Sequence, residues 1–214
     1  MKRIKIAFIG SDGSGKTTLI SNIKKQLEKE GKTAEVFFLG WRNFRNPILN
    51  FFSKVYLKEK IKKNADEEKL ARFRERSWFF YLIYYSELWL RYLNILFSKK
   101  DYILIDRYFY DELAFARGGK FKFFKLITPL PNFCFLLKSP LKIINSRQKQ
   151  KISKERFEYF YNNLENLSKS FAIIRIDTSK PINKTSKKVI AIIKASRKKS
   201  EPFKGRMNCA IYLF

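Results

Sequence analysis

Nine consecutive residues near the start of the chain have the composition of a phosphate-binding loop. The first eight, residues 10–17, fit the pattern G-x-x-x-x-G-K-[ST] at every fixed position, and Thr18 follows. Glycines let the backbone curl so that its N–H groups approach phosphate oxygens, and the N-terminus of a following helix adds partial positive charge. The residues predicted to bind a nucleotide triphosphate are Gly10, Ser11, Asp12, Gly13, Ser14, Gly15, Lys16, Thr17 and Thr18.

Two side chains of this loop supply the chemistry. Lys16 places a cation beside the β- and γ-phosphates, and the hydroxyl of Thr17 is the kind of oxygen ligand that Mg²⁺ prefers. The alternative is a glycine turn without function between a strand and a helix. The loop follows an apolar run at 4–9 and precedes a helical pattern at 16–30, and this context favours the phosphate site.

Asp106 and Arg107 end a second apolar run, at 101–107. Open parallel sheets bind ligands beyond the carboxyl ends of their strands, so both side chains are expected at the edge that carries the phosphate loop. Asp106 is predicted to hold Mg²⁺ through water, and Arg107 to clamp a phosphate with two parallel hydrogen bonds. A structural ion pair that caps the strand is the alternative.

A third feature is the basic segment 147–156, which has five cations in ten residues. These charges repel one another unless an anion joins them. A cationic segment that closes over the site would stabilise charge during phosphoryl transfer, and Arg147 is its strongest candidate. An ordinary solvated helix surface in a lysine-rich chain is the other interpretation.

These residues need a framework, and the pattern predicts an α/β domain. Short apolar runs predict five strands, at 4–9, 34–39, 102–105, 133–137 and 173–176. Helices are predicted at 16–30, within 66–97, from Ser139 and Pro140 onward with Ser139 as cap, and at 184–196. Alternating strands and helices predict a parallel sheet covered on both faces. The aromatic region 78–85 predicts core packing or a platform that stacks a base.

Composition narrows the class of protein. The chain of 214 residues carries a formal charge of +27, which favours nucleotides, nucleic acid or anionic membrane, or reflects only a lysine-rich composition. It has no histidine, which excludes histidine acid–base catalysis and histidine metal ligands. Two distant cysteines and a first segment without a secretory pattern predict a cytoplasmic protein.

In this order and spacing, the phosphate loop, Asp106-Arg107-Tyr108 and the segment from Ser139-Pro140 to Arg147 resemble the thymidylate kinase family of P-loop nucleotide kinases. Leu113-Ala114-Phe115 with Gly118-Gly119 adds to the likeness. The resemblance covers residues 3 to about 196. It implies a three-layer P-loop NTPase fold with five parallel strands, ATP and Mg²⁺ as cofactors, and phosphoryl transfer onto a nucleoside monophosphate, with dTMP as the expected acceptor.

By position, the resemblance places Arg107 on the acceptor phosphate, Asp12 at the acceptor sugar, and Tyr108 and Phe115 in the acceptor site. It places Arg147 in a lid of about 147–156 and implies nucleotide substrates and a homodimer. The chain departs from the family where Tyr110-Asp111-Glu112 stands in place of paired serines.

Two other functions stay open at this point. One is a kinase for another small acceptor, such as a nucleoside or a sugar derivative. The other is a basic NTP-binding protein that docks on nucleic acid or an anionic membrane. The expected domain is 1–196, followed by an extension at 197–214 of unassigned role.

Overall fold

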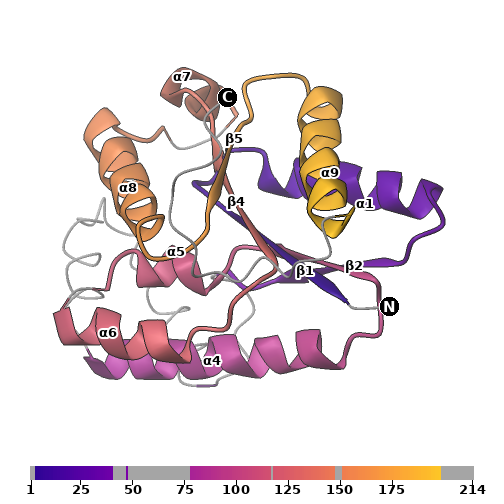
Figure 1. The fold of residues 1–214 in the computed structure, drawn as a ribbon. Coiled ribbons are helices and arrows are strands. Elements are labelled where there is room, and N and C mark those ends of the chain that lie inside the picture. Colours follow the sequence, from indigo (N-terminus) through magenta and orange to yellow (C-terminus); the bar gives the residue numbers. More distant parts are fainter. Residues whose placement is uncertain (1–2, 41–46, 48–77, 117, 148–150, 199–214) are drawn as a thin grey trace.

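A twisted, wholly parallel sheet forms the centre of the chain (Figure 1). The computed structural model describes residues 3–40, 47, 78–116, 118–147 and 151–198. The described strands are β1 (Ile4–Ile9), β2 (Ala34–Phe38), β3 (Tyr102–Asp106), β4 (Phe133–Lys138) and β5 (Ile174–Asp177). They lie in the order β2-β3-β1-β4-β5. β2 and β3 therefore lie on one side of β1, and β4 and β5 lie on the other side.

Helices cover both faces of this sheet, which confirms the predicted three-layer α/β fold (Figure 1). One face carries α1 (Lys16–Lys29) and α9 (Ile182–Lys198), and the other face carries the five described helices between them in the sequence. Those are α4 (Trp78–Phe97), α5 (Phe109–Leu113), α6 (Gly118–Ile127), α7 (Leu141–Ser146) and α8 (Lys154–Leu167).

Strand β1 shows why the sheet needs both layers. Its successive side chains point to opposite faces. Ile6 and Phe8 pack with α1 and α9, whereas Ala7 and Ile9 pack in the separate core beneath α4. All four are fully buried, as expected for a central strand of a parallel sheet. The result fixes the carboxyl end of β1, and therefore the start of the phosphate loop, between two cores.

Helix α4 uses its aromatic residues mainly as core. Tyr81, Tyr85, Leu88 and Tyr92 recur every three or four residues and are buried against the sheet side. The rings of Tyr85 and Phe124 of α6 lie 4.2 Å apart, centroid to centroid. Core packing is thus the role that the structure gives to this stripe.

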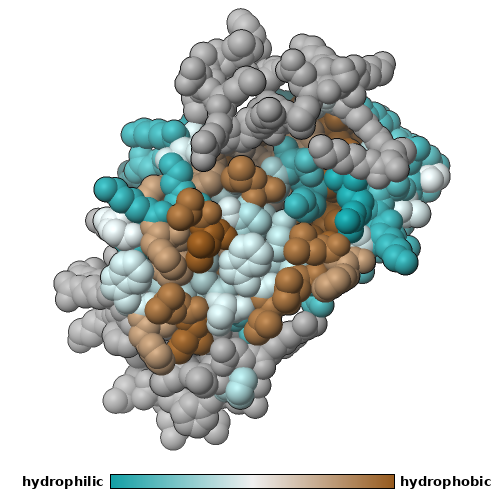
Figure 2. All heavy atoms as spheres, turned by 60° about the horizontal axis from the view of Figure 1, so that its bottom comes forward, coloured by the Kyte–Doolittle hydropathy of each residue, from teal (hydrophilic) through white to brown (hydrophobic). Residues whose placement is uncertain are grey.

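The outer surface of α4 and α6 is also apolar, and Figure 2 shows it from below. Several large side chains there are at least two-fifths exposed: Trp78, Phe79, Leu82, Leu90, Leu93, Leu96 and Phe97 on α4, and Phe123 and Leu126 on α6. No helix in the described part of the chain is long and apolar enough to span a lipid bilayer.

Three expectations about elements need correction. Ser139 does not cap α7, because Pro140 is the N-cap residue and the Ser139 hydroxyl lies 3.2 Å from that of Thr178. The last helix begins at Ile182, two residues before the predicted start. Helices α5, α6 and α8 were not predicted. The part of the expected middle helix at 66–77 lies outside the described residues.

Candidate functional site

The phosphate-binding loop connects β1 to α1 and has the backbone that its glycines predict. Gly15 caps α1 in the left-handed region, at φ 87°. A side chain at Gly10 would bring its Cβ to 2.6 Å from the carbonyl oxygen of Leu137, so only glycine fits between β1 and β4. Among the described residues, no side chain caps α1 and no acidic residue lies in its first turn. The N–H groups at this end of α1 therefore form a place for an anion.

Lys16 lies folded back into the loop. Its Nζ donates hydrogen bonds to the carbonyl oxygens of Gly10, at 3.0 Å, and Ser11, at 2.7 Å. Burial, followed by repulsion from Arg107, lowers the pKa of Lys16 from 10.5 to about 8. Asp111, Asp12 and Asp106 oppose this shift, and a triphosphate would add further negative charge beside the buried ammonium group.

Thr17 and Asp106 meet across neighbouring elements. The register of β1 and β3 sets Asp106 opposite Phe8, and the Thr17 hydroxyl donates to Asp106 Oδ2 at 2.9 Å. Asp106 Oδ1 is buried and makes no hydrogen bond to any described residue. Groups of three or more His, Cys, Asp or Glu side chains suited to a metal are absent from the described residues. One hydroxyl and one carboxylate fit Mg²⁺ that arrives with phosphate oxygens and water as its other ligands.

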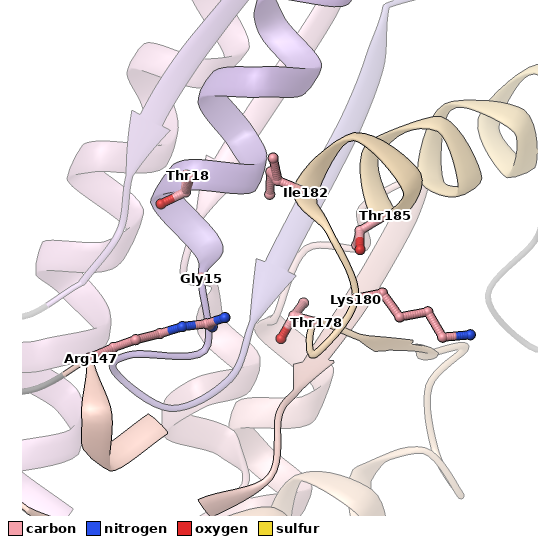
Figure 3. Close-up of a pocket in the computed structure, with 7 residues that line it drawn as sticks. All are labelled: Gly15, Thr18, Arg147, Thr178, Lys180, Ile182 and Thr185. Atoms are coloured by element: carbon pink, nitrogen blue, oxygen red, sulfur yellow. The ribbon is translucent and has the colours of Figure 1, made fainter. Parts of the chain in front are cut away.

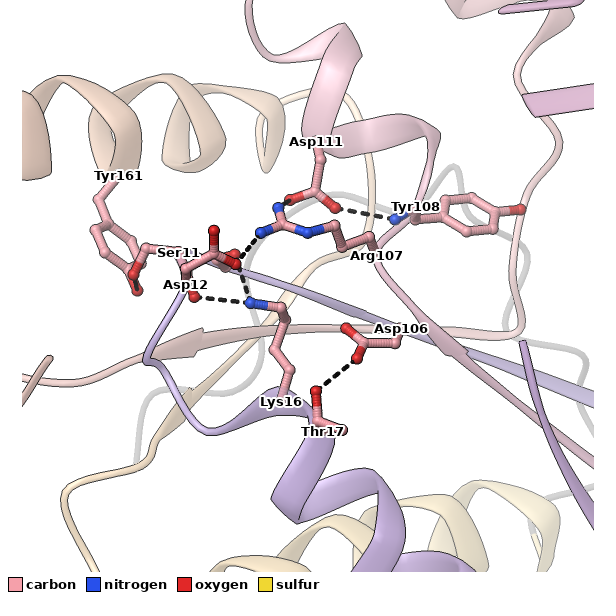
Figure 4. A network of polar contacts seen from close by, with 10 residues as sticks. Ser11, Asp12, Lys16, Thr17, Asp106, Arg107, Tyr108, Asp111 and Tyr161 are labelled. Carbon is pink, nitrogen blue, oxygen red and sulfur yellow. Dashed lines mark hydrogen bonds and ion pairs between the residues drawn. The ribbon is translucent and has the colours of Figure 1, made fainter. Parts of the chain in front are cut away.

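Arg107 lies in the same cluster as Lys16 (Figure 4). Its guanidinium pairs with Asp12 of the phosphate loop, and its Nη1 lies 3.7 Å from Asp111 Oδ1. Burial alone would lower the pKa of Arg107, but Asp111 and Asp12 raise it above its ordinary value. The third strand thus brings a permanently charged guanidinium to the phosphate loop.

Arg147 reaches the loop from the end of α7. Its Nη1 donates to the carbonyl oxygen of Gly13 at 3.4 Å, a long contact, and the side chain extends toward Gly15 (Figure 3). Residues 148–150 of the expected lid lie outside the described residues, and the segment continues into α8.

A cavity of about 210 Å³ adjoins Arg147 and the start of α1 (Figure 3). Thr178, after β5, closes one side and donates from its hydroxyl to the carbonyl oxygen of Ser14 at 2.8 Å. The residues lining the cavity are Gly15, Thr18, Arg147, Thr178, Lys180, Ile182 and Thr185. Because Gly15 and Thr18 also belong to the loop, a nucleotide held by its phosphates could extend into this space.

Two predicted acceptor residues lie apart from the cluster. The Tyr108 ring is buried, its hydroxyl donates to the Pro129 carbonyl oxygen at 3.0 Å, and it points away from Arg107 (Figure 4). Phe115 is half-buried and packs its ring near Tyr159 and Phe160 of α8. The structure therefore brings together Asp12, Lys16, Thr17, Asp106 and Arg107, but not Tyr108 or Phe115.

Sequence reasoning missed two contributors. Tyr161 of α8 donates from its hydroxyl to the Leu137 carbonyl oxygen at 2.9 Å and lies 3.1 Å from the Ser11 hydroxyl, so it ties α8 to the loop. Asp111 stood out only as a departure from the resembled family. Arg107 precedes α5 and has a left-handed backbone, so no helical spacing in the sequence signalled its contact with Asp111.

Comparison with known proteins agrees with this geometry. The family model described as "Thymidylate kinase" matches residues 8–189. A protein named "Probable thymidylate kinase 1", from Saccharolobus solfataricus, is 28% identical over 200 residues, which cover 88% of this chain and 95% of that protein. The structure of thymidylate kinase from Candida albicans shares the fold, with a TM-score of 0.55 and 18% identity over 91% of this chain and 93% of that one.

Proposed function

Because the chain belongs to the thymidylate kinase family, we propose that it transfers the γ-phosphoryl group of ATP to dTMP. Family membership makes it a nucleoside monophosphate kinase. The observation that carries the choice of chemistry is the position of Arg107 beside Lys16. Lys16 belongs to the loop for the donor phosphates, and Arg107 follows the neighbouring strand β3. The site can therefore hold the donor and acceptor phosphates next to each other.

Each residue of the site has a separate role in this reaction. The N–H groups of residues 10–18 and Lys16 hold the donor phosphates, and Lys16 exchanges its contacts with the Gly10 and Ser11 carbonyl groups for phosphate oxygens. Thr17 and Asp106 would hold Mg²⁺, which neutralises charge on the transferring group. Arg107 holds the acceptor phosphate. Arg147, from α7, approaches the loop where donor charge develops.

Catalysis in this scheme is positioning and charge stabilisation, with no covalent enzyme intermediate. The test is a coupled assay of ADP release with ATP, Mg²⁺ and dTMP, for the natural protein and for Lys16→Ala. We expect turnover only for the natural protein. Turnover by Lys16→Ala within tenfold of the natural protein would contradict the role given to the loop.

One observation supports a different small acceptor. Asp12 and Asp111 already offer two carboxylates to Arg107, so a phosphate must compete for it, whereas a nucleoside or a sugar derivative need not. An acceptor screen with dTMP, thymidine and sugar derivatives separates these cases. If thymidine is phosphorylated and dTMP is not, the nucleoside function replaces the one proposed.

Salt-dependent retention on DNA or anionic vesicles, without turnover of any acceptor, would instead favour the docking function.

We also propose that two copies pair through α4. The two charged residues of α4, Glu87 and Arg91, are buried and bond to each other at 2.7 Å, so its exposed face carries no charge. Each copy carries +27, and copies of like charge can meet closely only where cations are excluded. An exposed apolar surface of this extent is typical of an interface.

A further inference from the structure

Two carboxylates approach the guanidinium of Arg107, and they differ in burial. Asp12 belongs to the phosphate loop, and its side chain is 72% exposed. Asp111 belongs to α5, and its side chain is 7% exposed. Figure 4 shows that the two reach Arg107 from different elements. An exposed ion pair is released at little cost, whereas a buried charge that loses its partner is costly.

The position of Asp111 is set by the backbone. Its Oδ2 accepts the N–H of Tyr108 at 2.9 Å, and its own N–H donates to the Tyr108 carbonyl oxygen at 3.0 Å. These contacts belong to the first turn of α5. Its Oδ1 is buried, faces Arg107 Nη1 at 3.7 Å and makes no hydrogen bond to the residues that the structure describes. The carboxylate is therefore held in place whether or not Arg107 stays.

The stem of Arg107 is enclosed as well. Its backbone has φ 67°, in the left-handed region, and its N–H donates to the Phe8 carbonyl oxygen at 2.9 Å. Gly40 lies so close that a Cβ there would come to 2.6 Å from Arg107 Cδ. With its backbone and stem confined, the remaining freedom of Arg107 is the direction of the guanidinium.

We propose that Asp111 is a positioning residue that anchors the guanidinium of Arg107 from the buried side, so that the acceptor phosphate exchanges places with Asp12 alone. The exchange rests on the proposed function, whereas the anchoring does not. The carboxylate of Asp111 thus holds the guanidinium in its binding position before any acceptor arrives.

The anchoring is tested without activity, by NMR order parameters of the arginine Nε–H groups in the unliganded protein. Arg107 should be ordered, unlike Arg175, whose side chain is 60% exposed. It should stay ordered in Asp12→Ala and lose order in Asp111→Asn, which keeps an oxygen for the Tyr108 N–H. Order that persists in Asp111→Asn, or that collapses in Asp12→Ala, overturns the proposal. The Asp12→Ala result suffices should Asp111→Asn fail to fold.

Kinetics test the consequence for the acceptor. Asp111→Asn should lower kcat/KM for dTMP about 10²-fold, as expected when a binding group is displaced by about 1 Å, with the KM for ATP within twofold. The matched control is Glu112→Gln, which removes the neighbouring buried carboxylate of α5 and should change kcat/KM less than threefold. Equal losses in the two variants, or a parallel rise in the KM for ATP, would indicate a merely structural role and overturn the proposal.

The two hypotheses fail separately. If the natural protein does not phosphorylate dTMP but Arg107 shows the expected order in all three proteins, the proposed function fails and the anchoring stands. If dTMP is phosphorylated and the order of Arg107 depends on Asp12 rather than Asp111, the anchoring fails and the function stands.

Discussion

Thr17 donates its hydroxyl to the carboxylate of Asp106 at 2.9 Å, although 89 positions separate the two residues in the chain. The contact exists because β1 and β3 are neighbours and their carboxyl ends meet at one edge of the sheet. It leaves the second carboxylate oxygen of Asp106 buried and without a hydrogen bond among the described residues. This oxygen is the feature that the magnesium hypothesis explains.

Asp106→Asn is expected to raise the Mg²⁺ concentration needed for half-maximal activity by about 10–100-fold, because an amide is a weaker partner for the hydrated ion than a carboxylate. The measurement is ADP release against MgCl₂ at fixed ATP. Asp101→Asn is the control, because Asp101 precedes the same strand and accepts hydrogen bonds from Thr33 instead. An unchanged Mg²⁺ requirement in Asp106→Asn would remove Asp106 from the metal site.

The affinity for ATP is expected to fall above pH 8. The pKa of Lys16 is lowered to about 8, mainly by burial, so the unliganded protein loses this charge as the pH rises through 8. Binding must then restore the proton, and the association constant should fall by up to about tenfold per pH unit. Calorimetric titration at pH 7, 8, 9 and 9.5 measures this. Lys16→Met should bind more weakly at every pH and without the slope; a natural protein with constant affinity to pH 9.5 contradicts the assignment.

Arg147→Ala is expected to lower kcat by about 10²-fold while the KM for ATP changes less than fivefold, because the guanidinium acts where charge develops. Initial rates at saturating dTMP give both constants. Lys142→Ala removes an exposed cation from the same helix and should stay within twofold of the natural protein. Should both variants lose activity equally, the effect would come from the overall field of the chain rather than from Arg147.

Asp111→Asn is expected to melt at a higher temperature than the natural protein at pH 8, with a smaller difference at pH 4.5. Burial raises the pKa of Asp111 from 3.8 to about 6, although Arg107 opposes this. The folded state therefore holds the proton more tightly than the unfolded state, and the contribution of this group to the free energy of unfolding falls as the pH rises from about 4 to about 6.

Asparagine does not titrate, so the gain in melting temperature of Asp111→Asn over the natural protein should grow between about pH 4 and about pH 6 and then level off. Each 1 kcal/mol corresponds to about 2–4 °C in a chain of this length. Differential scanning calorimetry at four pH values measures the gain. A difference that does not depend on pH would show that the Asp111 pKa is ordinary in the folded protein.

Leu93→Lys, in the exposed face of α4, is expected to convert a dimer to a monomer, because it places a cation in the contact between two copies. Light scattering after gel filtration gives the mass. Tyr159→Lys changes an equally exposed residue on α8 and should leave the dimer intact. A natural protein that is monomeric at all concentrations would rule out the pairing.

The framework of the site could be predicted because its signals are local. Runs such as Ile4–Ile9 predict β-strands, and the glycines at 10, 13 and 15 predict the tight loop between β1 and α1. The end of β3 placed Asp106 and Arg107 correctly because parallel strands all present their carboxyl ends at one edge.

The direction of Tyr108 could not be predicted in this way. Arg107 adopts a left-handed backbone, which the sequence does not reveal for a residue other than glycine, and the Tyr108 ring then enters the core. The contact of Thr178 with Ser14 spans 164 positions and depends on how β5 ends beside the loop. Such contacts follow from the assembled sheet rather than from any local pattern.

Arg107 keeps a left-handed backbone, with φ 67°. A left-handed conformation costs an arginine about 1–2 kcal/mol that glycine avoids. A library of variants at position 107, sorted for thermal resistance alone, should accumulate glycine and asparagine, whereas the same library sorted for growth that depends on the enzyme should return arginine.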